Sequence, residues 1–385
     1  MSTNIVRSLN NRELNIRHNP KKFLSANYFN ESMVNRMTAE YQLCHEIDAW
    51  DQIICGSWNS TGNLLGCGKP RKGVQVFKPF RNFEETVVQV QNNCYLTDAL
   101  FMPKHENLLI VSSRNHSNYI SSSFNGLEMD ECVKVWNIET KTVYRKYCFR
   151  GLVEKLTTSE ALPNHIWFNI DQTTLKIAEA DLRAPSYNTL QLNVLQKHPD
   201  FLYSRNFDVN PVDEVTIAVG DHNQLVFYDR RMMSTLFVNH PTKTVDTSSL
   251  NGYNSYISQL TYSPNGEKLL LTKISSFNIF QYIAPAIGTS VENMRRLTLK
   301  SQMVMNTFKK SPKFLGQNYV LFDLFFKNCS IVFNLEDTRY VGKINISIHN
   351  SHFSNISIPH PYYCLIASTN ESMINFITPT SFDEN

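Results

Sequence analysis

The stretch Tyr262-Ser263-Pro264-Asn265-Gly266-Glu267-Lys268-Leu269-Leu270-Leu271 indicates how this chain folds. A Pro-Asn-Gly turn leads into a short apolar segment, and Phe277-Asn278-Ile279-Phe280 follows as a second segment of alternating pattern. Turn residues between short runs of period two are typical of antiparallel strands. We therefore take one turn and two strands as the unit to look for elsewhere in the chain.

The same unit occurs seven times along the 385 residues. One turn residue for each unit is Asn59, Pro103, Pro163, Asn210, Pro264, Gln317 and His360. The shortest spacings match the ~40–45 residues of a four-stranded propeller blade. Short units of this kind hide their apolar faces by stacking around a ring. The sequence therefore predicts an all-β chain: a seven-bladed WD-type β-propeller over residues 29–380, with residues 381–385 as a tail.

Two further features follow from the ring. A strand over about residues 34–43 would complete the last blade from the N-terminal side and remove an open sheet edge. The longer units contain polar stretches at residues 114–131, 234–254 and 283–312, which we expect to be surface loops.

Residues 1–28 differ from the ring and form a basic N-terminal arm. Apolar residues at Ile5, Leu9 and Ile16 give a loose helical stripe, and Pro20 would end such a helix. We expect a helix over residues 3–18 that docks on a partner; the alternative is a frayed tail.

Composition limits the classes of function. The net charge is only +3, with 42% hydrophobic and 18% charged residues, so the body lacks the basic balance of a nucleic-acid or anionic-membrane surface. Neither a membrane span nor a signal peptide is evident. The eight cysteines form no Cys-x-x-Cys pair, which indicates reduced thiols. We expect an intracellular protein, in the nucleus, the cytoplasm or both.

No motif for catalysis, a cofactor or a metal stands out. The sequence lacks a Gly-x-Ser-x-Gly elbow, a His-Glu-x-x-His pair and a glycine-rich dinucleotide fingerprint. A propeller enzyme would need acidic or histidine residues converging on the central channel, where the inner strands are mostly apolar or Ser/Thr. We therefore predict a protein without catalytic activity, cofactor or metal.

Two short strings at the ends of predicted fourth strands carry the strongest indication of a site. They are Ala180-Asp181-Leu182-Arg183 and Tyr228-Asp229-Arg230-Arg231, in consecutive units. Each places Asp two residues before Arg, so both arginines should emerge on the same rim, one blade apart. Such an arginine forms bidentate bonds to a partner's carboxylate, or it merely pairs with its Asp to staple a tight turn.

These strings make the chain resemble a known family, the WD-repeat DCAF substrate receptors of cullin-4 ubiquitin ligases. The subgroup that includes the WD and tetratricopeptide repeat protein is the most similar, although this chain lacks a tetratricopeptide array. Tyr228-Asp229-Arg230-Arg231-Met232 is the most specific match, and Ala180 and Tyr228 stand where the family has Trp. The resemblance extends over most of residues 30–380.

The resemblance implies a function and a site. The family's Arg binds the cullin-4 adaptor, the large subunit of the damage-specific DNA-binding protein, with help from an N-terminal helix. Carried over, the adaptor-binding residues are Arg183, Arg231, Asp181, Asp229, Tyr228, Arg230, Ile5 and Leu9. The implied protein is a non-catalytic receptor that recruits a protein target, whose identity the sequence does not give. The alternative, favoured by the missing Trp residues, is a WD-repeat scaffold in another complex.

Overall fold

The computed structural model describes residues 41–48, 52–70, 73–79, 84–88, 94–115, 131–149, 153, 155–171, 176–184, 186–191, 207–221, 223–236, 238–250, 255–275, 279–297, 312–324, 329–345, 356–361, 365–370 and 373–379. The predicted N-terminal helix, with Ile5 and Leu9, and the predicted tail lie outside these residues. Within them the regular elements are β-strands and 3-10 turns.

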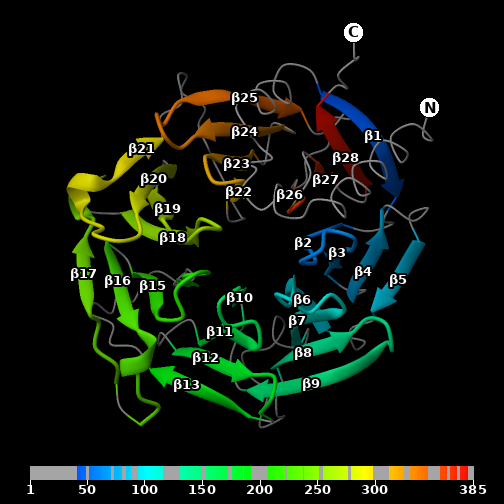
Figure 1. Ribbon diagram of the computed structural model, residues 1–385, viewed down its shortest axis with the longest axis horizontal. Coiled ribbons are helices and arrows are strands. Elements are labelled where there is room, and N and C mark those ends of the chain that lie inside the picture. Colours follow the sequence, from blue (N-terminus) through cyan, green and yellow to red (C-terminus); the bar gives the residue numbers. More distant parts are fainter. Residues whose placement is uncertain are drawn as a thin grey trace, which may run out of the picture.

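Seven four-stranded antiparallel sheets stand around a ring, as Figure 1 shows. The prediction of a seven-bladed β-propeller is thus confirmed. We number the blades along the chain, and each blade runs from an inner strand near the axis to an outer strand at the periphery. The two strands predicted for each unit are the second and third strands of its blade.

The first four blades follow the chain without a crossover. Blade 1 contains β2 (Cys55–Trp58), β3 (Leu65–Lys69), β4 (Gly73–Lys78) and β5 (Glu84–Val88). Blade 2 contains β6 (Cys94–Phe101), β7 (Leu108–Asn115), β8 (Glu131–Asn137) and β9 (Thr142–Phe149). Blade 3 contains β10 (Leu156–Thr158), β11 (His165–Asp171), β12 (Lys176–Asp181) and β13 (Tyr187–Gln191). Blade 4 contains β14 (Phe207–Val209), β15 (Thr216–Asp221), β16 (Gln224–Asp229) and β17 (Lys243–Asp246).

Blades 5 and 6 repeat this order, and blade 7 takes its outer strand from the other end of the chain. Blade 5 contains β18 (Ser255–Tyr262), β19 (Lys268–Ser275), β20 (Ile279–Pro285) and β21 (Arg295–Leu297). Blade 6 contains β22 (Lys313–Leu315), β23 (Tyr319–Leu324), β24 (Cys329–Asn334) and β25 (Tyr340–Asn345). Blade 7 contains β26 (Ile356–Pro359), β27 (Ile366–Asn370), β28 (Met373–Pro379) and β1 (Tyr41–Asp48). The 3-10 turns are η2 (Arg230–Met232), η3 (Ser248–Leu250) and η4 (Val291–Asn293).

The core lies between the blades. Alternating residues of the middle strands pack against the next blade, so one cluster joins Val135 and Tyr147 of blade 2 to Phe168 and Ala178 of blade 3. Similar clusters join blades 3 and 4, 4 and 5, 5 and 6, 6 and 7, and 7 and 1. Burial of these apolar side chains on both faces of each sheet is the main source of stability.

The N-terminal strand closes the ring. β1 pairs with β28 in antiparallel register from Tyr41 opposite Pro379 to Asp48 opposite Met373. The predicted closing strand is therefore confirmed in kind, but its described part reaches five residues beyond the expected end at Leu43. The strand extends because the whole of β28 offers backbone groups to pair with.

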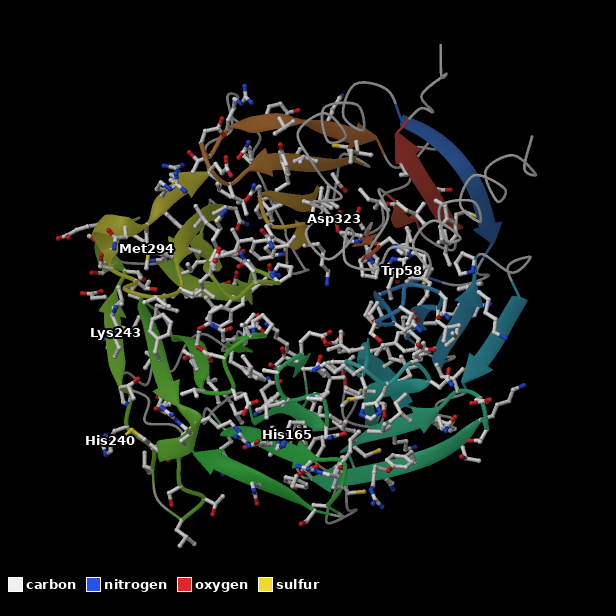
Figure 2. All side chains as sticks on the ribbon, in the orientation of Figure 1. Trp58, His165, His240, Lys243, Met294 and Asp323 are labelled. Atoms are coloured by element: carbon white, nitrogen blue, oxygen red, sulfur yellow. The ribbon has the colours of Figure 1, made fainter. Side chains whose placement is uncertain are left out.

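Side chains also bind across the seam between blade 7 and blade 1, where the ring closes. The Trp58 indole of blade 1 donates to the Ile358 carbonyl of blade 7 at 3.0 Å, and Figure 2 shows Trp58 at this seam. The His360 ring lies 4.6 Å from that indole and donates from Nε2 to the Gly62 carbonyl at 2.9 Å. Gly62 has a φ of 72°, and a Cβ there would lie 2.4 Å from the His360 ring. The turn therefore needs glycine for two reasons.

Two sequence-based expectations about strands were wrong. The stretches expected as loops at 234–254 and 283–312 contain the outer strands β17 and β21, which are too short to show a period-two pattern. Of the third stretch, 114–131, the ends belong to β7 and β8, and residues 116–130 lie outside the described part of the chain. The two Asp-x-Arg strings follow third strands, β12 and β16, since each blade still has its outer strand to come.

We predict that His360 makes stability depend on pH. Burial lowers the pKa of its imidazole to about 4, and the bond to Gly62 opposes this only in part. With ~6.5 in the unfolded chain, the unfolded state binds more protons between these values. The free energy of unfolding should therefore fall by about 3 kcal/mol as pH drops from 6.5 to 4, and reach its full value above 6.5.

Urea unfolding of the wild type and His360→Gln across this pH range checks the effect. Gln keeps a donor for the Gly62 carbonyl but does not titrate, so its pH dependence should be flatter. Parallel curves for the two proteins would contradict the prediction.

Candidate functional site

The two predicted arginines have the same geometry. Arg183 donates from Nε to Asp181 Oδ1 at 2.9 Å and from Nη2 to Oδ2 at 2.7 Å. Arg231 makes the equivalent bonds to Asp229 at 3.1 and 2.8 Å. Both arginine side chains are 70% exposed. The fork-to-fork pairing fixes each guanidinium in place while leaving it open to solvent.

Electrostatics keep both carboxylates ionised. The hydrogen bonds from Arg183 hold the pKa of Asp181 at about 2. The bonds from Arg231 likewise lower the pKa of Asp229. Each rim position therefore presents an intact ion pair throughout the physiological pH range.

The turn itself does not require the arginine. In both strings the Asp accepts a hydrogen bond from the backbone N–H two residues on, at 2.9 Å. Blades 2 and 6 form the same turn at the same place with Asn and Glu: Asn137 accepts from Glu139 N, and Asn334 accepts from Glu336 N. An Asx turn needs only the side-chain oxygen. Stapling of the turn therefore does not account for Arg in blades 3 and 4.

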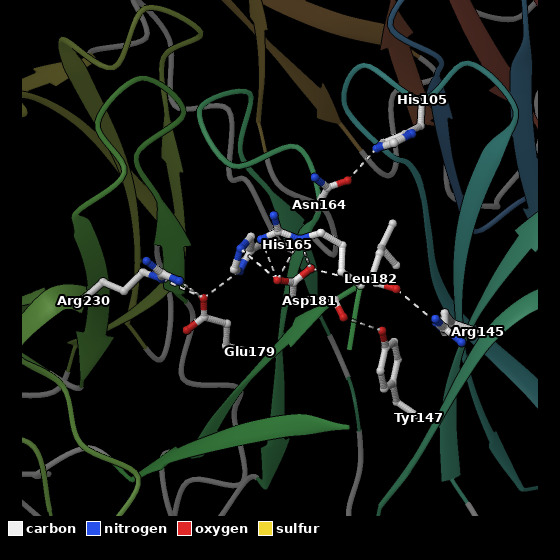
Figure 3. A network of polar contacts seen from close by, with 10 residues as sticks. His105, Arg145, Tyr147, Asn164, His165, Glu179, Asp181, Leu182 and Arg230 are labelled. Carbon is white, nitrogen blue, oxygen red and sulfur yellow. Dashed lines mark hydrogen bonds and ion pairs between the residues drawn. The ribbon is translucent and has the colours of Figure 1, made fainter. Parts of the chain in front are cut away.

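The structure adds a link between the two blades that sequence analysis missed. Arg230 turns inward and donates from Nε to Glu179 of blade 3 at 2.7 Å. Glu179 also accepts from His165 Nδ1 at 2.8 Å, and His165 Nε2 lies 3.8 Å from Asp181 (Figure 3). Burial raises the pKa of Glu179, but the bonds from His165 and Arg230 outweigh it and lower that pKa.

Blade 2 holds the Arg183 turn from the other side. Arg145 donates from Nε to the Leu182 carbonyl at 3.0 Å, and the Tyr147 hydroxyl donates to the Asp181 carbonyl at 3.2 Å. Figure 3 shows both side chains reaching this turn. The position of Arg183 is thus set by blades 2, 3 and 4 together.

The other predicted site residues lie elsewhere. Tyr228 is 1% exposed and packs in the core between blades 3 and 4, and Ala180 is fully buried. The guanidinium of Arg230 is paired with Glu179, as described above. The structure therefore brings Arg183, Asp181, Arg231 and Asp229 to one rim, with Tyr228 and Arg230 beneath it.

Exposed apolar side chains follow Arg231 in the chain and also occur before β15 of the same blade, and sequence analysis did not identify them. Met232 is 77% exposed, Leu236 83% and Val212 59%. Such residues in a soluble protein are typical of interaction surfaces when they gather. We call the surface formed by Arg183, Arg231, Met232, Leu236 and Val212 the arginine rim.

The inner strands are mostly apolar or Ser/Thr, as expected, but β6 and β14 each carry a carboxylate, and β23 carries a third beside the inner strand β22. Asp98 accepts from Leu156 N at 3.0 Å, Asp208 from Tyr262 N at 2.8 Å, and Asp323 from Ser357 N at 2.9 Å. Each bond joins one blade to the inner strand of the next; Asp98 and Asp208 do so from inner strands and Asp323 from the second strand, β23. Within the described ranges, no three His, Cys, Asp or Glu side chains gather as a metal site would require. No helix in the same ranges could span a membrane.

We predict that the adjacent arginines 230 and 231 contribute differently to the stability of the protein. Arg230→Ala leaves Glu179, whose side chain is 10% exposed, without its cation and should lower the free energy of unfolding by about 2 kcal/mol. Arg231→Ala removes an exposed pair and should leave the urea midpoint unchanged. Urea unfolding at neutral pH compares the two; equal midpoints would contradict the inward role of Arg230.

Comparison with known proteins agrees with the fold. A β-propeller domain of Cps50 (Swd1) from Myceliophteria thermophila superposes with a TM-score of 0.63 at 14% identity, covering 88% of this chain and 100% of that domain. A chain of the mitotic checkpoint complex superposes with a TM-score of 0.59 at 13% identity, covering 88% of this chain and 96% of that chain. No protein-family model and no curated protein matches the sequence. At these identities the likeness is one of fold: the chain is a seven-bladed β-propeller.

Proposed function

We propose that this protein is a non-catalytic substrate receptor, which docks through its arginine rim on the adaptor of a cullin-4 ubiquitin ligase. The adaptor is the large subunit of the damage-specific DNA-binding protein, and another surface of the propeller holds a protein target. Holding the target near the ligase raises its effective concentration at the site of ubiquitin transfer. The propeller itself forms or breaks no bond.

The observation that carries this proposal is the pair of ordered, exposed guanidiniums on neighbouring blades. Blades 2 and 6 make the same turn with Glu at the equivalent position, so the fold does not require arginine there in blades 3 and 4. The resemblance of both strings to the adaptor-binding box of DCAF receptors supports the same assignment.

The physics of the rim suits protein docking. Each guanidinium is held by its Asp, so the arginine side chain loses little conformational entropy when a partner binds there. Arginine is also enriched among the residues that dominate binding energy. Met232 and Leu236 supply apolar area beside Arg231, and burial of that area adds a non-directional attraction.

A scaffold in another complex is the second candidate. It is supported by Ala180 and Tyr228, two buried residues that stand where the family has Trp. The same rim would then bind a different protein. Binding to the purified adaptor separates the two functions.

We predict that charge reversal at the rim abolishes adaptor binding without unfolding the propeller. The pair Asp181→Asn and Arg183→Glu copies the turn that blade 2 forms with Asn137 and Glu139, so it should fold. The same pair at Asp229 and Arg231 copies it in blade 4. Each double variant should weaken binding of the purified adaptor at least about tenfold in a calorimetric titration.

The control is Arg339→Glu, which reverses an exposed, Asp-paired arginine in blade 6. It should bind as the wild type does. If the folded wild type fails to bind the adaptor, the receptor function is wrong and the scaffold function stands. Equal binding by the wild type and both rim variants would show that the adaptor docks elsewhere.

A further inference from the structure

A pocket opens beside Arg183, at the seam between blades 2 and 3. Its volume is about 460 Å³, within the ~300–1,000 Å³ range of ligand-sized pockets. Blade 2 contributes Leu108 and Tyr144, and blade 3 contributes Leu182 and Arg183. The pocket therefore adjoins the arginine rim but is built from a different pair of blades.

The walls of this pocket are held in place by bonds across the seam. His105 donates from Nε2 to Asn164 Oδ1 at 2.9 Å, as Figure 3 shows, and both residues line the pocket. Arg145 binds the Leu182 carbonyl, and its guanidinium lies 5.4 Å from the centre of the Tyr144 ring. A cation over an aromatic face orients the ring. The pocket is thus formed before any ligand arrives.

The lining combines apolar and cationic groups. Leu182 is 2% exposed, Leu108 is half-buried, and Tyr144 is 49% exposed, so an apolar side chain finds apolar contacts there. Lys104 has no polar partner among the described residues, and Arg183 leaves Nη1 unpaired there once Asp181 has taken Nε and Nη2. Both cations lie in the pocket lining, with Glu106 as its one carboxylate.

We propose that this pocket binds an aromatic or large aliphatic side chain of a docked protein, next to an acidic residue of the same segment. The apolar side chain packs on Leu108, Leu182 and Tyr144, and the acidic neighbour pairs with Lys104 and Arg183. An acidic neighbour fits the free donors of the lining, because Lys104 has no carboxylate partner among the described residues and Arg183 keeps Nη1 available beside Asp181. Aromatic anchors in pre-formed pockets commonly dominate protein interfaces. That the bound segment belongs to a docked protein rests on the proposed function, but binding in the pocket can be tested without the adaptor.

The test uses defined peptides with the full-length protein. Saturation-transfer difference NMR would follow the ring protons of the acetylated peptide Gly-Asp-Phe-Gly at millimolar concentration. Gly-Lys-Phe-Gly and Gly-Asp-Ser-Gly serve as the charge-reversed and ring-deleted comparisons. We expect a signal from the Asp-Phe peptide at least about fivefold above that of either comparison.

Two pocket variants and two controls assign the signal to this site. Tyr144→Ser and Lys104→Glu should each reduce it at least about fivefold. Val143→Ser changes the neighbouring exposed residue on the same strand, which does not line the pocket, and should leave it intact. Arg231→Glu, one blade away, should also leave it intact even though it disrupts adaptor docking.

Three outcomes would overturn the inference. They are no signal from the Asp-Phe peptide, an equal or stronger signal from the Lys-Phe peptide, and retention of the signal in both folded pocket variants. Failure of the adaptor to bind while the peptide binds would instead reject only the proposed receptor function.

Discussion

Everything in this molecule depends on closing the ring. A blade buries both faces only if it has a neighbour on each side, so an open array would expose the faces of its two end blades. Pairing of β1 with β28 joins the two ends of the chain through backbone hydrogen bonds. Trp58 and His360 reinforce the neighbouring seam between blades 7 and 1, each with a bond to a carbonyl of the opposite blade. Closure is therefore both a backbone and a side-chain constraint.

Between the blades, polar groups add direction to apolar packing. Asp98, Asp208 and Asp323 each accept a backbone N–H from the next inner strand. Lys155 of blade 3 donates to the Phe207 carbonyl of blade 4 and the Leu260 carbonyl of blade 5. Buried bonds of this kind fix the spacing and register of neighbouring sheets, which non-directional burial does not. They hold the ring although most Trp-Asp and Gly-His dipeptides of WD repeats are missing from the sequence.

The candidate site is a product of this rigid frame. Arg183 and Arg231 lie on turns whose carbonyls and carboxylates are bound from adjacent blades, through Arg145, Tyr147 and the contact between Arg230 and Glu179. A surface that is already ordered loses little entropy on docking. The bonds between blades that stabilise the ring thus also hold the arginine rim and the neighbouring pocket in fixed positions.

Local patterning in the sequence is enough to predict the ring, its seven units, the closing strand and the two Asp-x-Arg turns, because period-two alternation and turn residues are local properties. Which arginine faces solvent depends instead on the packing of one blade against the next. Arg230 and Arg231 are neighbours in the chain, yet one binds Glu179 and the other is exposed, since Glu179 belongs to another blade. The pocket between blades 2 and 3 is likewise assembled from distant segments. Its grouping of side chains depends on how sheets pack, and a pattern along one strand does not contain that information.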